Sequence, residues 1–147
     1  MLGLVKVVGE QQVGVLVRFG KPREPPRGPG RVWTIPRVDQ LVIVNLRPTT
    51  IDLPPVVATT KDGRALSTVA HVHARVVSPR DAALRVVDYV QATSQLAETA
   101  VRSVLEEYSA DDALFDRATI ERVLQQTINE ATERWGVEVS RVEIDFP

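Results

Sequence analysis

The chain has 147 residues, of which 44% are hydrophobic, 5% aromatic and 25% charged. A chain of this length is expected to fold as one ordinary domain with an aliphatic core. Its net charge of −1 argues against a general nucleic-acid-binding domain, because such domains carry a clear basic excess. The absence of cysteine excludes a disulfide framework, a thiolate nucleophile and a thiolate zinc site.

No segment has the composition of a signal peptide or a membrane span. The first residues, Met1–Lys6, form too short an apolar stretch and lack a charged leader. The longest aliphatic run, Leu41–Val44, has the length of a buried strand, whereas a transmembrane helix needs ~18 apolar residues. We therefore expect the chain by itself to be soluble.

The first half of the sequence predicts short strands separated by turns. Val13–Phe19, Val32–Ile35 and Gln40–Leu46 are rich in β-branched residues, which favours strands. Between the first two, Pro22–Gly30 holds four prolines and two glycines, so it is predicted to be a stiff loop and neither helix nor central strand. Two short extended pieces follow, each marked by proline.

The longest predicted strand is Arg64–Val77. It follows a turn at Lys61–Gly63, where Asp-Gly supplies a residue that tolerates positive φ. Its apolar and polar residues alternate, which predicts a sheet with one covered face and one wetter face. The covered face is assigned Leu66, Ala70, Val72, Ala74 and Val76, and the wetter face Ser67, His71, His73 and Arg75.

From Ser78 onward the hydrophobic spacing becomes helical. Serine is a common N-cap and proline fits the first turn, so Ser78-Pro79 predicts a helix start, and this helix is predicted to run to about Val90. Apolar residues spaced by three and four predict two more helices. Their stripes are Leu96, Ala100, Val101, Val104, Leu105 and Tyr108, and then Ile120, Leu124, Ile128, Ala131 and Trp135.

The third helix is bounded at both ends. Asp111 and Asp112 are interpreted as capping its start, and Gly136 stands where a helix end favours positive φ. The fold is therefore predicted to be α+β, with about three helices packed on a mainly antiparallel sheet that includes the N-terminal strands and the C-terminal strand. It is predicted as a single domain over 1–147, with a β-rich part at about 1–77, a helical part at about 78–136 and a final strand at about 137–146.

No arrangement of residues predicts catalysis. The sequence has no Gly-x-Ser-x-Gly elbow, and Gly28-Pro-Gly30 lacks the Gly-Lys-Ser/Thr ending of a phosphate loop. His71 and His73 would point the same way and offer two metal ligands, but a catalytic zinc site needs a third. We interpret the pair as part of a half-exposed sheet face and keep a metal-dependent enzyme as a third alternative. No metal, cofactor or catalytic residue is predicted.

Charge is distributed unevenly along the chain. Six basic residues and one acid lie from Arg18 to Arg37, whereas seven acids and two arginines lie from Glu98 to Glu121. This predicts one positive and one negative end of the molecule. Four cations of the proline-rich loop are candidates to face an anionic lipid surface, where each contributes roughly 1 kcal/mol. They are Lys21, Arg23, Arg27 and Arg31. The alternative is a solvated loop whose charges protect an edge strand from aggregation.

Several short motifs, taken together and in order, resemble the SPFH or Band 7 domain of the stomatin, prohibitin and flotillin family. The resemblance is closest to the stomatin-like branch and covers the chain from about Val13 to Pro147. In the first half the motifs are Arg18-Phe-Gly-Lys21, Gly28-Pro-Gly30, Pro36 with Asp39, and Thr60-Lys-Asp62. In the second half they are Asp116-Arg117 with Ile120, Trp135-Gly136-Val137 and Arg141-Val-Glu-Ile-Asp145.

The resemblance implies a non-enzymatic scaffold. Members of this family assemble into oligomers at the membrane surface, organise lipid microdomains and modulate channels or membrane proteases. We accordingly expect partners of three kinds, namely further copies of the chain, a membrane surface or membrane proteins, and a membrane protease, but not nucleic acid. In its full-length context the domain is expected on the cytoplasmic side of a membrane. The alternative is a soluble adaptor that regulates a protease or another partner without lipid contact.

Overall fold

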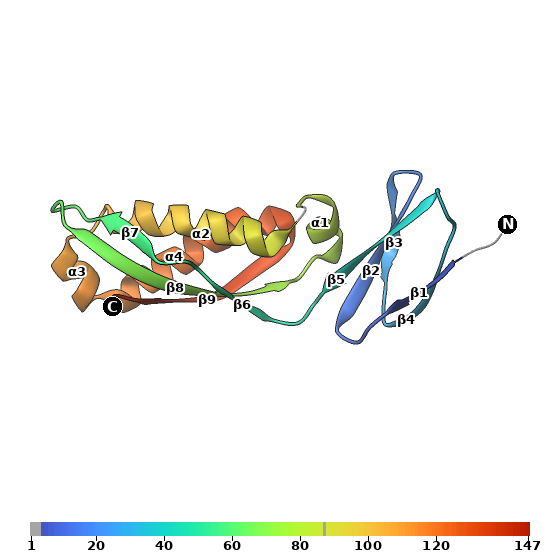
Figure 1. The fold of residues 1–147 in the computed structure, drawn as a ribbon, viewed down its shortest axis with the longest axis horizontal. Helices are drawn as coiled ribbons and strands as arrows, with labels where there is room; N and C mark the ends of the chain where they lie inside the picture. The colour runs from blue at the N-terminus through green and yellow to red at the C-terminus, as the bar shows by residue number, and fades with distance from the viewer. Residues whose placement is uncertain (1–3, 87) are drawn as a thin grey trace.

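The computed structural model describes residues 4–86 and 88–147. The molecule is elongated, with a small head built from five strands at one end and a larger body of strands and helices (Figure 1). The head comprises residues 4–45 and the body residues 49–145. All strand pairs in the described residues are antiparallel, so the predicted α+β class with mainly antiparallel pairing is confirmed.

The head contains two small sheets, in which β2 lies between β3 and β5, and β1 pairs with β4. The strands are β1 (Leu4–Val8), β2 (Gln12–Arg18), β3 (Lys21–Arg27), β4 (Gly30–Thr34) and β5 (Asp39–Asn45). The prediction of a loop at Pro22–Gly30 is wrong for residues 22–27, which form the edge strand β3. An edge accepts proline because the missing N–H group can face solvent. Strand β1 was not predicted.

The body is built on the long strand β8 (Ala65–Val76). Strands β6 (Thr49–Asp52) and β7 (Val56–Thr59) pair with successive parts of β8, and β9 (Val137–Asp145) pairs with its opposite side. Every second residue from Ala70 to Val76 is buried, and the residues between them are more exposed. The two faces predicted from the alternation of this strand are therefore confirmed.

In the described residues the body has four α-helices and a short 3-10 turn. They are α1 (Pro79–Leu84), α2 (Tyr89–Leu105), α3 (Ala110–Phe115), α4 (Arg117–Thr132) and the 3-10 turn η1 (Glu133–Trp135). Helices α2 and α4 cover one face of the body sheet, α1 lies at the end near the head and α3 lies at the opposite end (Figure 1). None of the helices in the described part of the chain is both long and apolar enough to cross a bilayer.

The predicted helix start at Ser78-Pro79 is confirmed, but the predicted end at about Val90 is wrong, because α1 already ends at Leu84. Asp88 then caps the separate helix α2: its side chain accepts hydrogen bonds from the backbone N–H groups of Val90 and Gln91 at 3.1 and 3.3 Å. Aspartate is among the preferred N-cap residues, since its side chain satisfies N–H groups that have no partner inside the helix.

The interpretation of Asp111 and Asp112 as caps of the last long helix is also wrong. Both lie in the first turn of α3, where negative charge interacts favourably with the helix dipole. The N-cap of α3 is Ser109, whose Oγ accepts a hydrogen bond from the backbone N–H of Asp112 at 3.1 Å. Asp116 separates α3 from α4, a break that the apolar stripe does not reveal.

The core lies between the body sheet and the two long helices. Helix α4 buries Ile120, Leu124 and Ile128, and α2 buries Val101 and Leu105, all with 0% exposure. These residues belong to the stripes predicted from the sequence, and they pack in one cluster with the buried residues of β8 and β9. Burying side chains of this size stabilises a fold by roughly 1.5–3 kcal/mol each.

Gly136 connects the helices to β9 and adopts the left-handed conformation, with a φ of 68°, as predicted. Its carbonyl oxygen accepts hydrogen bonds from the N–H groups of Val77 and Ser78 at 2.8 and 3.0 Å. The end of β8 and the start of α1 are thereby held against the start of β9.

Candidate lipid-facing site

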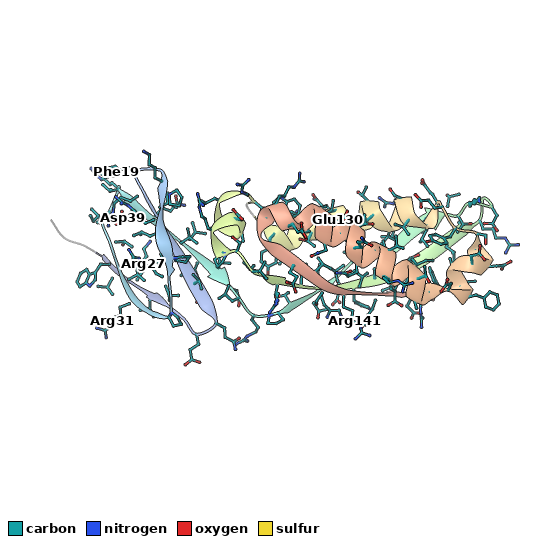
Figure 2. The ribbon with its side chains drawn as sticks, turned by 180° about the vertical axis from the view of Figure 1, so that it is seen from behind. Phe19, Arg27, Arg31, Asp39, Glu130 and Arg141 are labelled. Atoms are coloured by element: carbon teal, nitrogen blue, oxygen red, sulfur yellow. The ribbon has the colours of Figure 1, made fainter. Side chains whose placement is uncertain are left out.

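The four cations predicted to face lipid lie in the head, and all of them are exposed. Lys21, Arg23 and Arg27 belong to β3, and Arg31 belongs to β4. Figure 2 labels Arg27 and Arg31 at the same end of the molecule as Phe19. The cations are therefore presented by strands, and the register of these strands decides which of them lie together.

Arg27 and Arg31 lie around one groove of about 510 Å³ in the head. Lys21 and Arg23 are not part of its lining; Lys21 directly follows the turn between β2 and β3, opposite Arg18. The structure thus separates the four predicted cations into two pairs. The groove is lined mainly by Leu16, Arg18, Arg27, Arg31, Val32 and Trp33.

An apolar face beside this groove escaped the sequence analysis. In the ribbon of β1 and β4, Val5 pairs with Trp33 and Val7 pairs with Arg31. The side chains of Val5, Val7 and Trp33, here called the ribbon face, are exposed beside that of Arg31, and Trp33 is 69% exposed. Exposed tryptophan beside cations is typical of membrane interfaces, because the indole ring is apolar and its N–H group is polar. Neither segment alternates regularly between apolar and polar residues, so this face is recognised only when the two strands are paired.

Arg18 stabilises the head through an ion pair. Its Nε and Nη2 donate to the two carboxylate oxygens of Asp39 at 2.7 and 3.0 Å, and the Ile35 N–H donates to the same carboxylate at 2.9 Å. The Asp39 side chain is 0% exposed. The hydrogen bonds from Arg18 lower the pKa of Asp39 from 3.8 to about 2. This pair joins two of the family-like motifs, because it connects the end of β2 to the start of β5.

We expect Asp39→Asn to remove a pH-dependent contribution to stability. The folded-state pKa of about 2 lies below the ordinary value of 3.8. Ionised Asp39 therefore stabilises the fold at pH values above 3.8. That contribution is lost as the pH falls through about 2. In urea unfolding, the difference in free energy between wild type and the variant should therefore shrink between about pH 6 and about pH 2. A constant difference over that range would contradict the role of the charge.

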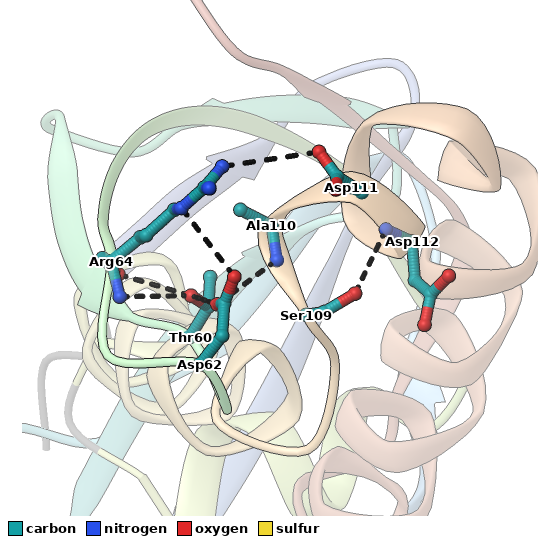
Figure 3. A network of polar contacts seen from close by, with 7 residues as sticks. All are labelled: Thr60, Asp62, Arg64, Ser109, Ala110, Asp111 and Asp112. Atoms are coloured by element: carbon teal, nitrogen blue, oxygen red, sulfur yellow. Dashed lines mark hydrogen bonds and ion pairs between the residues drawn. The ribbon is translucent and has the colours of Figure 1, made fainter.

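A network of polar contacts closes the opposite end of the molecule (Figure 3). The carboxylate of Asp62 accepts hydrogen bonds from the Thr60 hydroxyl and from the Ala110 N–H, the latter at 3.2 Å. Arg64 lies between two acids, 3.6 Å from Asp62 and 3.9 Å from Asp111. Hydrogen bonding from Thr60 lowers the pKa of Asp62. The network ties the turn between β7 and β8 to the start of α3, so the motif Thr60-Lys-Asp62 has a structural role.

The two charged segments lie at opposite ends of the molecule, as the charge distribution predicts. The basic segment 18–37 belongs to the head, whereas the acidic segment 98–121 runs along α2, through α3 and into α4 at the far end (Figure 1). This acidic end also exposes Leu114 and Phe115, and Phe115 is 91% exposed. This second apolar surface was not predicted from the sequence.

His71 and His73 lie on the uncovered face of β8 and take part in cross-strand contacts. His71 Nδ1 is 2.6 Å from a carboxylate oxygen of Asp52, and His73 Nε2 is 3.6 Å from Glu143. Across residues 4–86 and 88–147, no three or more His, Cys, Asp and Glu side chains gather as ligands for a metal ion. The two histidines are placed where the sheet face was predicted.

A model of the SPFH domain / Band 7 family matches residues 6–147. A protein of Archaeoglobus fulgidus is 40% identical over 144 residues, which cover 98% of this chain and 57% of that protein. A stomatin homolog of Pyrococcus horikoshii is 39% identical over 140 residues, which cover 95% of this chain and 52% of the homolog. Mouse stomatin is 33% identical over 141 residues, or 95% of this chain and 50% of stomatin. The chain spans about half the length of these relatives.

Proposed function

Because this chain belongs to the SPFH domain / Band 7 family and its relatives include stomatins, we propose that it is a non-enzymatic, membrane-associated scaffold domain that associates with copies of itself. In this proposal the single domain 1–147 lies on the cytoplasmic side of a membrane, and it organises membrane microdomains or modulates membrane proteins such as a protease. In this proposal the domain needs no cofactor, because it acts by binding lipid and other proteins through its surface.

One observation carries the proposal: the head combines the apolar ribbon face with the unpaired guanidinium groups of Arg27 and Arg31. Within the described residues neither arginine has an ion-pair partner. Near an anionic bilayer each cation contributes roughly 1 kcal/mol to the free energy of binding. Exposed apolar side chains add a favourable contribution that salt does not screen. The acidic segment lies at the far end, so an anionic surface attracts the head and repels that end.

Co-sedimentation with vesicles tests this surface. The wild-type chain is expected to bind vesicles containing anionic lipid at low salt and to bind neutral vesicles much more weakly. Arg27→Gln combined with Arg31→Gln should weaken binding to anionic vesicles roughly thirty-fold, since two contributions of about 1 kcal/mol are removed. Lys21→Gln combined with Arg23→Gln should have a smaller effect, because these residues lie outside the groove. Trp33→Ser should weaken binding even at high salt.

The matched control removes the same charge from the helices by Arg102→Gln combined with Arg122→Gln, both at exposed positions. This control should bind vesicles as wild type does. Equal losses for the control and for the Arg27 and Arg31 variant would mean that net charge alone governs binding. Absence of binding to any vesicle would reject the head as a lipid-facing site.

A second candidate function is a soluble adaptor that regulates a protease or another protein without lipid contact. The observation that favours it is the exposure of Leu114 and Phe115 at the acidic end, where an apolar partner surface flanked by cations would fit. The vesicle experiment separates the two functions. Indifference to every vesicle would favour the adaptor, whereas binding that depends on Arg27, Arg31 and Trp33 favours the membrane scaffold.

A further inference from the structure

We propose that the outward face of α3 is a docking surface for a cationic amphipathic segment of a partner protein. The inference rests on the proposed role of the domain in modulating other proteins, and it assigns that role a surface and a partner chemistry. The outward residues, here called the α3 face, are Asp111, Asp112, Leu114 and Phe115. Leu114 is 53% exposed and Phe115 is 91% exposed. The face lies at the end of the molecule far from the head (Figure 1).

Helix periodicity places the acids of the α3 face beside its apolar residues. Side chains three or four positions apart in a helix are neighbours on its surface. Asp111 therefore adjoins Leu114 and Phe115, and Asp112 adjoins Phe115. The α3 face is thus one patch in which carboxylates and large apolar side chains are intermixed. Large apolar side chains that are exposed together, with polar groups around them, are typical of surfaces that bind other proteins.

The body holds this helix in a fixed position. Its inner side is anchored in the core by Ala113, which is 0% exposed. The backbone N–H of Ala110 donates to the carboxylate of Asp62 at 3.2 Å (Figure 3), and the N–H of Lys61 donates to the carbonyl oxygen of Tyr108 at 2.8 Å. A rigid surface loses little conformational entropy when a partner binds. The exposed side chains of α3 are therefore already positioned for a contact.

Several carboxylates at this end of the molecule lack a cationic partner. Among the ion pairs of the described residues, none involves Glu106, Glu107 or Asp112, and all three residues are exposed. Asp111 lies 3.9 Å from Arg64, and both side chains are largely exposed, so this pair contributes little. A partner that carries cations gains from this negative charge, whereas an anionic partner is repelled.

The position of the α3 face decides between the possible occupants. An anionic bilayer repels the acidic end, and it attracts the head at the opposite end of the molecule (Figure 1). A symmetric contact between two α3 faces would bring carboxylates against carboxylates. A segment with apolar side chains on one face and lysine or arginine on the other complements both the apolar and the acidic groups, as amphipathic helices do in the grooves that bind them.

Titration with a designed peptide tests the surface. The probe is a synthetic helical peptide with leucine on one face and lysine on the other, and the chain is expected to bind it. Leu114→Ser combined with Phe115→Ser should raise the Kd by at least about tenfold, because two large apolar side chains are lost from the contact. Glu107→Gln combined with Asp112→Asn should raise the Kd by about threefold or more and should make it less dependent on salt.

Matched controls change the same kinds of side chain elsewhere on the molecule. Glu130→Gln combined with Glu133→Gln removes two exposed acids from the opposite end of the helical layer. Leu84→Ser removes an apolar side chain that is 43% exposed at the end of α1. Both controls should bind the peptide as wild type does. A second peptide, in which glutamate replaces every lysine, should bind at least about tenfold more weakly than the first. Circular dichroism establishes that each variant is folded.

Three results would overturn the inference. They are an unchanged Kd for the double serine variant, equal losses for the two charge variants, and a double serine variant with a lower molar mass than wild type in sedimentation. The last result would assign the α3 face to a contact between copies. The lipid-facing site is tested separately, because every α3 variant should bind anionic vesicles at least as tightly as wild type. Vesicle binding that is lost only in the head variants, together with peptide binding that is lost only in the α3 variants, would support both proposals.

Discussion

Gly136→Ala is expected to destabilise the chain by about 3–5 kcal/mol, because a backbone cost and a steric cost fall on the same residue. The φ of 68° is unfavourable for any residue with a Cβ atom. A Cβ at this position would lie 2.4 Å from the carbonyl oxygen of Ser78 and 2.6 Å from the Ser78 Cβ. Ser78 cannot easily withdraw, since its own N–H donates to the Gly136 carbonyl oxygen at 3.0 Å.

Gly63→Ala separates the two costs. Gly63 has a similar φ of 82°, but an added Cβ there would meet nothing within 4 Å. Only the backbone cost of about 1 kcal/mol should appear in this control. The free energies of unfolding of wild type and both variants, measured in urea, give the comparison. Equal losses for the two variants would show that the contact with Ser78 is unimportant.

Leu124→Ala is expected to cost about 2–5 kcal/mol, the range for truncating a fully buried leucine. Leu124 has 0% exposure and belongs to the main core cluster, in which α4 packs against β9 and α2. Removal of its side chain leaves a cavity beneath the helix that packs against β9 and α2. The loss should appear as a lower urea midpoint for the cooperative unfolding transition.

Gln126→Ala provides the control for Leu124→Ala on the same helix. Gln126 is exposed, so its replacement should change the free energy of unfolding by no more than about 0.5 kcal/mol. A Leu124→Ala variant as stable as this control would mean that the core collapses to fill the space of the missing side chain. The packing of α4 against both α2 and β9 argues against such a collapse.

The parts of the fold that were predicted correctly depend on local repeats. The alternation along β8, the apolar stripe of α4 and the glycine at the end of the helices each follow from neighbouring residues in one segment. The break between α1 and α2 was missed because the residues from Leu84 to Asp88 do not interrupt the apolar spacing strongly. The second helix starts with a cap made by one side chain, Asp88.

The candidate site was predicted only in part, for a related reason. Four cations were identified by their charge alone, namely Lys21, Arg23, Arg27 and Arg31. Charge does not indicate which residues of two paired strands lie side by side. Pairing of β1 with β4 places Trp33 beside Val5 and joins a predicted strand and an unassigned N-terminal segment in one exposed apolar face. Neither strand carries that information alone, because the partner of a residue in a sheet is set by distant parts of the chain.

The sequence by itself determined the family, the α+β class, the opposite charges of the two ends and most of the buried residues, because composition, motifs and periodicity are properties of single segments. The tertiary structure alone decided which cations share a groove with Trp33 and that Arg18 and Asp39 neutralise each other. These features arise from contacts between segments far apart in the chain, and only folding brings those segments into register.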